Sequence, residues 1–169
     1  MTFAESVSIN LDEKVARALS DLKMAHRVFG CDPSLADTAA FCEHYGFSLG
    51  QSANAIVVAS KNEPVKFACC IVLATTKLDV NKKVSLLLGT KKVSFANAEQ
   101  TMELTGMQIG GVTPFGLPPI PIYVDAAVMQ QGDVILGGGN RSTKVFMAPS
   151  ELLKLPGVEV IEGLAILKS

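Results

Sequence analysis

Residues 67–74 read FACCIVLA, the longest unbroken apolar run in the 169-residue chain. The run is too short to cross a bilayer as a helix, which takes about 20 residues, so it predicts a buried β-strand. Within a strand, Cys69 and Cys70 face opposite sides of the sheet. No Cys-x-x-Cys pair occurs among the four cysteines. We therefore expect reduced, mostly buried thiols, as in a cytoplasmic protein.

The apolar run sits inside a predicted strand over residues 65–74, which pairs with a strand over residues 55–59 (AIVVA). Residues 61–64 (KNEP) supply the turn between them. Short apolar segments elsewhere predict further strands at 28–31, 93–96, 120–124, 134–136, 144–147 and 158–161.

Helices are predicted between these strands from apolar spacing and end signals. They cover residues 12–27, 32–45, 78–88, 98–105 and a short segment that begins at Pro149. Asn97 suits the cap of the fourth helix and Gly106 its end. The irregular mixture favours one α/β domain with a mixed sheet, spanning residues 1–169.

Composition narrows the class of protein. Hydrophobic residues make up 49% and charged residues 18%, with a mean hydropathy of +0.35, so a disordered chain is excluded. The formal net charge is −1, so the chain lacks the excess of basic residues with which proteins bind long duplex nucleic acid. Binding of an RNA end or of a small anionic ligand is still compatible with this charge. The first residues show no secretory signal, and we expect no membrane partner.

The segment GMQIGGVTPFGLPPIP, residues 106–121, is the most unusual in the chain, with four glycines and four prolines. Long loops inside compact domains are uncommon and often functional. Gly110 and Gly111 let the backbone approach a ligand, and the prolines would hold main-chain N–H groups in place. A rigid surface connection without a ligand is the alternative.

A second glycine cluster, GGGNR at residues 137–141, follows a predicted strand. It suits a phosphate or carbonyl oxygen, or simply a hairpin turn. Neither cluster has the spacing of a dinucleotide fingerprint, and no Gly-Lys-Ser/Thr of a P-loop occurs.

Two single polar residues adjoin predicted strands. Asp125 follows the strand at 120–124, where a carboxylate can bind an amine or a ribose hydroxyl, or cap the next turn. Asn54 stands between two alanines at the start of the strand over 55–59, and its ordinary role is that of a strand-start side chain.

The sequence gives little support for a catalytic thiol or for a metal site. Cys42 and His44 lie two apart on a predicted helix and do not face each other, so a thiol enzyme using Cys42 or Cys31 is a minor hypothesis. His26 and His44 suit helix ends. Two histidines without clustered thiols also argue against a zinc site, and we expect no metal or cofactor.

Three segments together resemble the YbaK/prolyl-tRNA-editing domain family. They are residues 78–116 (LD…ELTGMQIGGVTPFG), 121–128 (PIYVDAAV) and 135–147 (ILGGGNRSTKVFM), and the resemblance extends over about residues 36–155. It implies a compact mixed α/β domain with a barrel-like sheet flanked by helices. It also implies a metal-free hydrolase that cleaves the ester of mischarged aminoacyl-tRNA, most often tRNA for proline carrying a small amino acid, with prolyl-tRNA synthetase as a possible partner.

The resemblance also implies site residues. The family's Gly-x-x-x-Pro motif falls on Gly110 to Pro114, which includes Gly111 and Thr113, and its backbone holds the acylated 3′ end. Asp125 matches an aspartate at the pocket. Gly138, Gly139 and Arg141 match the glycine turn that lines it.

One position departs from the family pattern. Many members carry a lysine where this chain has Asn54. The change removes a cation that would meet the terminal phosphate or polarise the ester. A non-catalytic module that binds tRNA or a synthetase is therefore the alternative to a deacylase. An aminoacyl ester is already activated for hydrolysis. A deacylase therefore needs only to place a water molecule and to stabilise the oxyanion, here with the N–H groups of Gly110 to Thr113.

Overall fold

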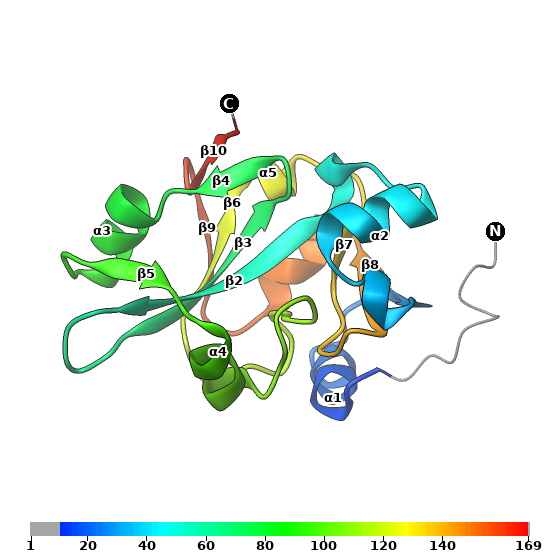
Figure 1. The fold of residues 1–169 in the computed structure, drawn as a ribbon, viewed down its shortest axis with the longest axis horizontal. Coiled ribbons are helices and arrows are strands. Elements are labelled where there is room, and N and C mark those ends of the chain that lie inside the picture. Colours follow the sequence, from blue (N-terminus) through cyan, green and yellow to red (C-terminus); the bar gives the residue numbers. More distant parts are fainter. Residues whose placement is uncertain (1–10, 169) are drawn as a thin grey trace.

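The computed structural model describes residues 11–168 and has a mixed α/β architecture (Figure 1). Its largest sheet has five strands in the order β5-β2-β3-β6-β9. The central strands β2 (Ala53–Ser60) and β3 (Phe67–Leu73) pair antiparallel, and β5 (Val93–Phe95) lies antiparallel outside β2. On the other side, β6 (Ile122–Asp125) runs parallel to β3, and β9 (Val158–Ile161) runs parallel to β6.

Two smaller sheets complete the strand set of the described residues. One is antiparallel and has the order β1-β8-β7, with β1 over Arg27–Gly30, β8 over Thr143–Met147 and β7 over Val134–Gly137. The other pairs β4 (Thr76–Leu78) with β10 (Ala165–Leu167). The predicted mixed α/β class is confirmed.

The expected barrel-like sheet is not found among residues 11–168. A lone parallel bridge, Ser52 with Ile135, joins the five-stranded sheet to the three-stranded one. The strands β5 and β9 each pair on one side only, so the sheets remain open. The bridge nevertheless brings the start of β2 beside β7, and this junction proves to be where the site lies.

Helices cover the sheets as short segments. They are α1 (Glu13–Asp21), η1 (Pro33–Leu35), α2 (Thr38–Tyr45), η2 (Leu49–Gln51), η3 (Val80–Val84), α3 (Ser85–Leu88), α4 (Ala98–Thr105), α5 (Ala126–Met129) and η4 (Pro149–Lys154). The prediction for α4 is confirmed at both ends. Asn97 accepts from the Gln100 amide, and Gly106 ends the helix in the left-handed region.

Three predicted helices are shorter than expected. Helix α1 ends at Asp21 rather than near residue 27, since the chain turns through Lys23 at φ +54° and enters β1. The segment 78–88 begins as the last residue of β4, then makes one π-helical turn before α3. Apolar spacing predicts which residues are buried but not where a turn interrupts the helix.

The predicted helix over 32–45 is broken into η1 and α2. Asp37 has extended backbone angles, φ −64° and ψ 142°, and the helix α2 starts anew at Thr38. The break matters for the site, because it exposes the main-chain carbonyl of Ala36 and the side chain of Asp37 to the region between α2 and the sheets.

The core forms on both faces of β3. Cys69 and Ile71 pack in one cluster with α1, β7 and β8, while Cys70 and Val72 pack in a second cluster with β4 and α3. This confirms that the adjacent cysteines face opposite sides. The cysteines Cys31, Cys42, Cys69 and Cys70 are all buried as free thiols.

Candidate functional site

A cavity of about 330 Å³ lies where the start of β2 meets β7, under the N-terminal end of α2. The loop after α4 and the single lysine of β8 close its remaining sides. The cavity is lined by Asp37, Thr38, Phe41, Ser52, Ala53, Asn54, Ala55, Ile56, Val57, Phe95, Ala96, Thr101, Ile109, Gly110, Val112, Ile135, Leu136, Gly137 and Lys144.

The two glycine clusters pack against each other, main chain on main chain. The Gly139 amide donates to the Gly111 carbonyl at 2.8 Å. A Cβ on Gly111 would lie 2.6 Å from the Asn140 carbonyl carbon, and one on Gly137 would lie 2.4 Å from the Val112 oxygen. Side chains at these positions would force the two segments apart, so the glycines are required by close packing of the cavity wall.

Gly110 is the residue of this pair that lines the cavity. Its φ of +98° favours glycine, and an added Cβ would collide with the Arg141 guanidinium. The neighbouring Gly111 amide donates to the Gln108 carbonyl at 2.9 Å, so this N–H closes a turn and is not directed at a ligand. The Gly111 amide is therefore not a free donor for a substrate.

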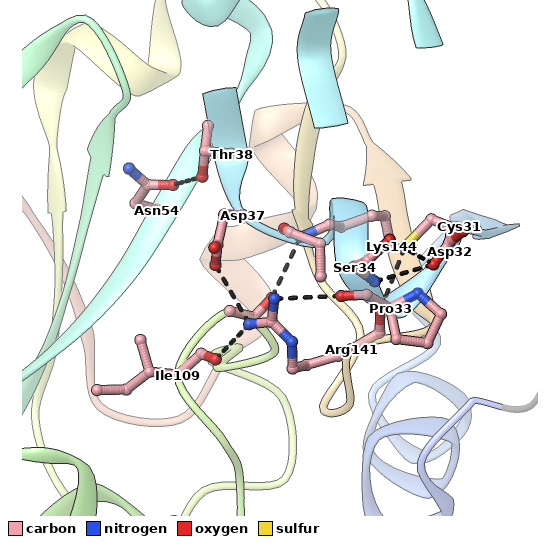
Figure 2. A network of polar contacts seen from close by, with 12 residues as sticks. Cys31, Asp32, Pro33, Ser34, Asp37, Thr38, Asn54, Ile109, Arg141 and Lys144 are labelled. Atoms are coloured by element: carbon pink, nitrogen blue, oxygen red, sulfur yellow. Dashed lines mark hydrogen bonds and ion pairs between the residues drawn. The ribbon is translucent and has the colours of Figure 1, made fainter. Parts of the chain in front are cut away.

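Arg141 joins three segments at the edge of the cavity (Figure 2). One guanidinium nitrogen, Nη1, donates to the Ile109 carbonyl at 2.8 Å and to Asp37 Oδ1 at 3.2 Å. The other, Nη2, donates to the Pro33 carbonyl at 3.2 Å. The arginine thus holds the glycine-rich loop against the turn between η1 and α2. It leaves the Asp37 side chain 71% exposed beside the cavity.

Asn54 lies on the β2 wall of the cavity. Its Oδ1 accepts a hydrogen bond from Thr38 Oγ1 at 2.7 Å. Because the oxygen is held by Thr38, the amide nitrogen points away from it (Figure 2). The pair presents an oriented side-chain N–H donor on a wall that is otherwise largely apolar.

Lys144, which the sequence reasoning did not single out, is the buried cation of this cavity. It is 6% exposed, and its Nζ donates to the carbonyls of Ala36 at 2.6 Å and Gly110 at 3.2 Å. The ammonium also lies 5.4 Å from the centre of the Phe41 ring. Burial lowers the pKa of Lys144 below the usual 10.5. The available signal was a lone lysine within the apolar strand that follows GGGNR.

Asp125 ends β6 as predicted but is not among the residues that line the cavity. It is 2% exposed, and the main-chain amides of Ala126, Leu164 and Ala165 lie close enough to act on its carboxylate. Burial raises the pKa of Asp125, although these amides oppose the rise.

The remaining predicted residues do not line the cavity. Thr113 is fully buried, Pro114 lines a separate groove beside α1, and Gly138 packs against Thr143. Of the nine residues proposed from the sequence, the structure brings Asn54 and Gly110 to the cavity, with Arg141 holding its edge.

The thiols are poorly suited to nucleophilic chemistry. Burial raises the pKa of both Cys31 and Cys42, and it raises the pKa of Cys70 to about 12. The Cys42 thiol donates to the Ser48 carbonyl at 3.7 Å, while the His44 ring packs edge-on against Tyr45. These contacts do not form a Cys–His pair.

Residues 11–168 contain neither a metal-ligating cluster nor a membrane-spanning helix. No group of three or more His, Cys, Asp or Glu side chains there could hold a metal ion. No helix in that range has the length and apolar character needed to span a membrane.

The described chain is a mixed α/β domain with a cavity between its two larger sheets, and comparison with known proteins identifies its family. The model of the aminoacyl-tRNA editing domain matches residues 32–155, and the chain belongs to this family. The match covers the turn before α2, the cavity walls and both glycine clusters.

Individual relatives agree with this assignment. The chain is 29% identical over 122 residues to "Uncharacterized protein YwhH" of Bacillus subtilis, covering 72% of this chain and 75% of that one. It is 27% identical over 108 residues to "Putative Cys-tRNA(Pro)/Cys-tRNA(Cys) deacylase EbsC" of Enterococcus faecalis, covering 63% of each. A solved structure described as "a putative trans-editing enzyme for prolyl tRNA synthetase" superimposes with a TM-score of 0.77 at 25% identity. The superposition covers 95% of this chain and all of that one.

Proposed function

We propose that this protein is a trans-editing hydrolase that cleaves the ester of tRNA for proline carrying a small non-cognate amino acid. The observation that carries the proposal is the cavity at the β2–β7 junction, which lies within the residues matched by the aminoacyl-tRNA editing family. The names of the relatives from Enterococcus faecalis and of the solved structure point to the same class of substrate.

The cavity has the size of a small-molecule site. Its volume of about 330 Å³ falls at the lower end of the range of about 300–1,000 Å³ for ligand pockets. An aminoacyl group and part of its ribose fit such a volume, whereas duplex RNA does not. The substrate therefore enters through its single-stranded 3′ end.

Apolar side chains at the cavity suit an unpaired RNA end. Phe95 is 55% exposed and Ile109 is 54% exposed, and both line the cavity. Single-stranded bases stack on such surfaces, with about 1–3 kcal/mol per base from aromatic stacking. Recognition by stacking is compatible with the net charge of −1, because it requires few phosphate contacts.

The reaction is hydrolysis without a protein nucleophile. A water oxygen adds to the ester carbonyl carbon, and the resulting oxyanion collapses with cleavage of the bond to the ribose oxygen. That oxygen takes up the proton released by the water, which leaves a free amino acid and a tRNA hydroxyl. The neighbouring ribose hydroxyl assists in placing the water, a step that uses the substrate itself.

Three residue roles follow for the proposed reaction. The Asn54 amide orients the ester, and Gly110 shapes the wall beside it. Arg141 positions the loop that carries Gly110. We assign Asp125 a structural role, since its buried carboxylate lies outside the cavity lining.

The test is deacylation of tRNA for proline charged with alanine, cysteine, serine or threonine, measured against spontaneous hydrolysis. We expect at least one substrate to be hydrolysed faster with the wild-type protein, and Asn54→Ala to slow that reaction. Asn62→Ala, in the β2–β3 turn, is the matched control and should leave the rate unchanged. No acceleration across the panel would reject the proposal.

The same assay decides the alternative of a non-catalytic binding module, which rests on Asn54 replacing the lysine of many relatives. Tight binding of tRNA or of prolyl-tRNA synthetase without turnover, together with activity gained by Asn54→Lys, would favour that module. A deacylase acting on cellular tRNA would work in the cytoplasm.

A further inference from the structure

Lys144 is held inside the cavity wall at a cost that its structural contacts do not explain. A buried ammonium loses hydration, and such a charge is normally compensated by an ion pair. Among residues 11–168, no carboxylate oxygen lies within 4.0 Å of its Nζ. The carbonyls of Ala36 and Gly110 are its hydrogen-bond partners in the described chain.

Those two carbonyls come from two different segments, so they fix where the ammonium lies. Ala36 belongs to the turn between η1 and α2, and Gly110 belongs to the glycine-rich loop. A lysine ammonium has three N–H donors, and these carbonyls use two of them. The third N–H donor has no carbonyl partner in the described chain. Lys144 lines the cavity, and the two carbonyls keep its side chain from swinging out freely.

One of the main-chain amides expected to face a substrate, that of Gly111, is already engaged within the loop. The Gly111 amide donates to the Gln108 carbonyl, and Gly110 turns its carbonyl oxygen toward Lys144. A positioned cation beside a developing oxyanion is an effective replacement, because the low-dielectric surroundings strengthen the interaction.

We propose that Lys144 is a catalytic residue that donates a hydrogen bond to the carbonyl oxygen of the substrate ester and stabilises the oxyanion formed when water adds. This inference rests on the proposed deacylase function. Lys144 keeps its proton throughout: negative charge builds on the carbonyl oxygen during addition and is lost when the bond to the ribose oxygen breaks. The ammonium lowers the barrier because it interacts more strongly with the charged oxyanion than with the neutral ester.

The protonation state adds a second readout. The titratable and charged groups that act on the Lys144 ammonium are the thiols of Cys31 and Cys42, the Asp37 carboxylate and the Arg141 guanidinium. The two thiols and Asp37 raise the pKa of Lys144, but burial, followed by the Arg141 charge, lowers it, and the net result is a pKa below 10.5. The contribution of Lys144 is therefore present below that lowered pKa and is lost as the pH rises through it.

The experiment compares steady-state deacylation by wild type, Lys144→Met and Lys14→Met, after subtraction of spontaneous hydrolysis. Lys14 is a matched control, since its Nζ also donates to a main-chain carbonyl, that of Thr105 at 2.7 Å, but away from the cavity. We expect Lys144→Met to lower kcat by about 10²–10³-fold, as removal of one oxyanion donor does. KM should change by no more than about threefold, and Lys14→Met should keep the wild-type kcat.

The pH dependence separates catalysis from a purely structural role. The ratio of wild-type to Lys144→Met kcat should fall as the pH rises, because only the wild type loses an ammonium. A kcat for Lys144→Met within about threefold of wild type, or an effect confined to KM, would overturn the inference while leaving the deacylase function intact. Absence of turnover by the wild type would overturn both. If Lys144→Met is unfolded at the assay temperature, Lys144→Gln, a neutral donor, decides by the same criteria.

Discussion

Substitution of Gly111 by alanine tests whether the two glycine clusters form the cavity wall by close main-chain packing. The new Cβ would lie 2.6 Å from the Asn140 carbonyl carbon and oxygen and 2.9 Å from its Cα. Ordinary contact begins at 3.4 Å, so the two main-chain segments must move apart by several tenths of an ångström. That movement also strains the hydrogen bond of 2.8 Å between the Gly139 amide and the Gly111 carbonyl.

The expected destabilisation follows from these two effects. Overpacking costs about 1–3 kcal/mol, and loss of one main-chain hydrogen bond costs about 0.5–1.5 kcal/mol. We therefore expect Gly111→Ala to lower the free energy of unfolding by about 2–4 kcal/mol. The value is measured by urea denaturation at neutral pH, followed by circular dichroism.

Gly132→Ala is the matched control. A Cβ there meets no atom within 4 Å, and the residue lies outside the left-handed region. Gly132→Ala should be neutral or gain about 0.4–1 kcal/mol, since alanine restricts the unfolded chain. Equal stability of the two variants, within about 0.5 kcal/mol, would refute the packing argument.

Three further outcomes are expected. The double variant Cys31→Ala/Cys42→Ala should retain deacylation, because both thiols have raised pKa values and neither lies on the cavity lining; loss of turnover in a folded double variant would revive the thiol mechanism. Arg141→Met should weaken activity by about tenfold, by freeing the loop that carries Gly110, and should raise proteolytic cleavage within that loop; an unchanged cleavage pattern would contradict the clamp. The pKa of Glu151 is lowered by hydrogen bonds from Lys154 and from the Ala25 amide, so its contribution is present above the usual value of 4.5 and is lost as the pH falls. Glu151→Gln should accordingly cost more stability at pH 7 than at pH 3 in urea titrations, and an equal cost at both would disprove the assignment.

Much of the fold can be predicted from the sequence because many helices and strands are determined by nearby residues alone. Asn97 and Gly106 delimit α4 through capping chemistry that involves only nearby residues. The apolar run in β3 needs no partner to be recognised as buried. Helix interruptions are different: the break at Asp37 depends on packing and on hydrogen bonds from Arg141, more than a hundred residues away in the chain.

The site was predictable only where its residues stand out locally. Asn54, as a polar residue between alanines, and Gly110, in a glycine-rich loop, carry such signals, and both line the cavity. Lys144 does not, because its burial arises only when β8 packs beneath α2 and the glycine-rich loop. Asp125 shows the reverse case: a carboxylate at a strand end suggested a binding residue, but this one is buried and lies outside the cavity lining.

The most direct test of the central claim is a single-turnover measurement with wild-type protein in excess over alanyl-tRNA for proline. The cavity and the family assignment predict ester cleavage at least about tenfold faster than spontaneous hydrolysis, with free alanine and intact tRNA as the products. A rate equal to the spontaneous one, for this substrate and for the cysteinyl, seryl and threonyl forms, would contradict the account.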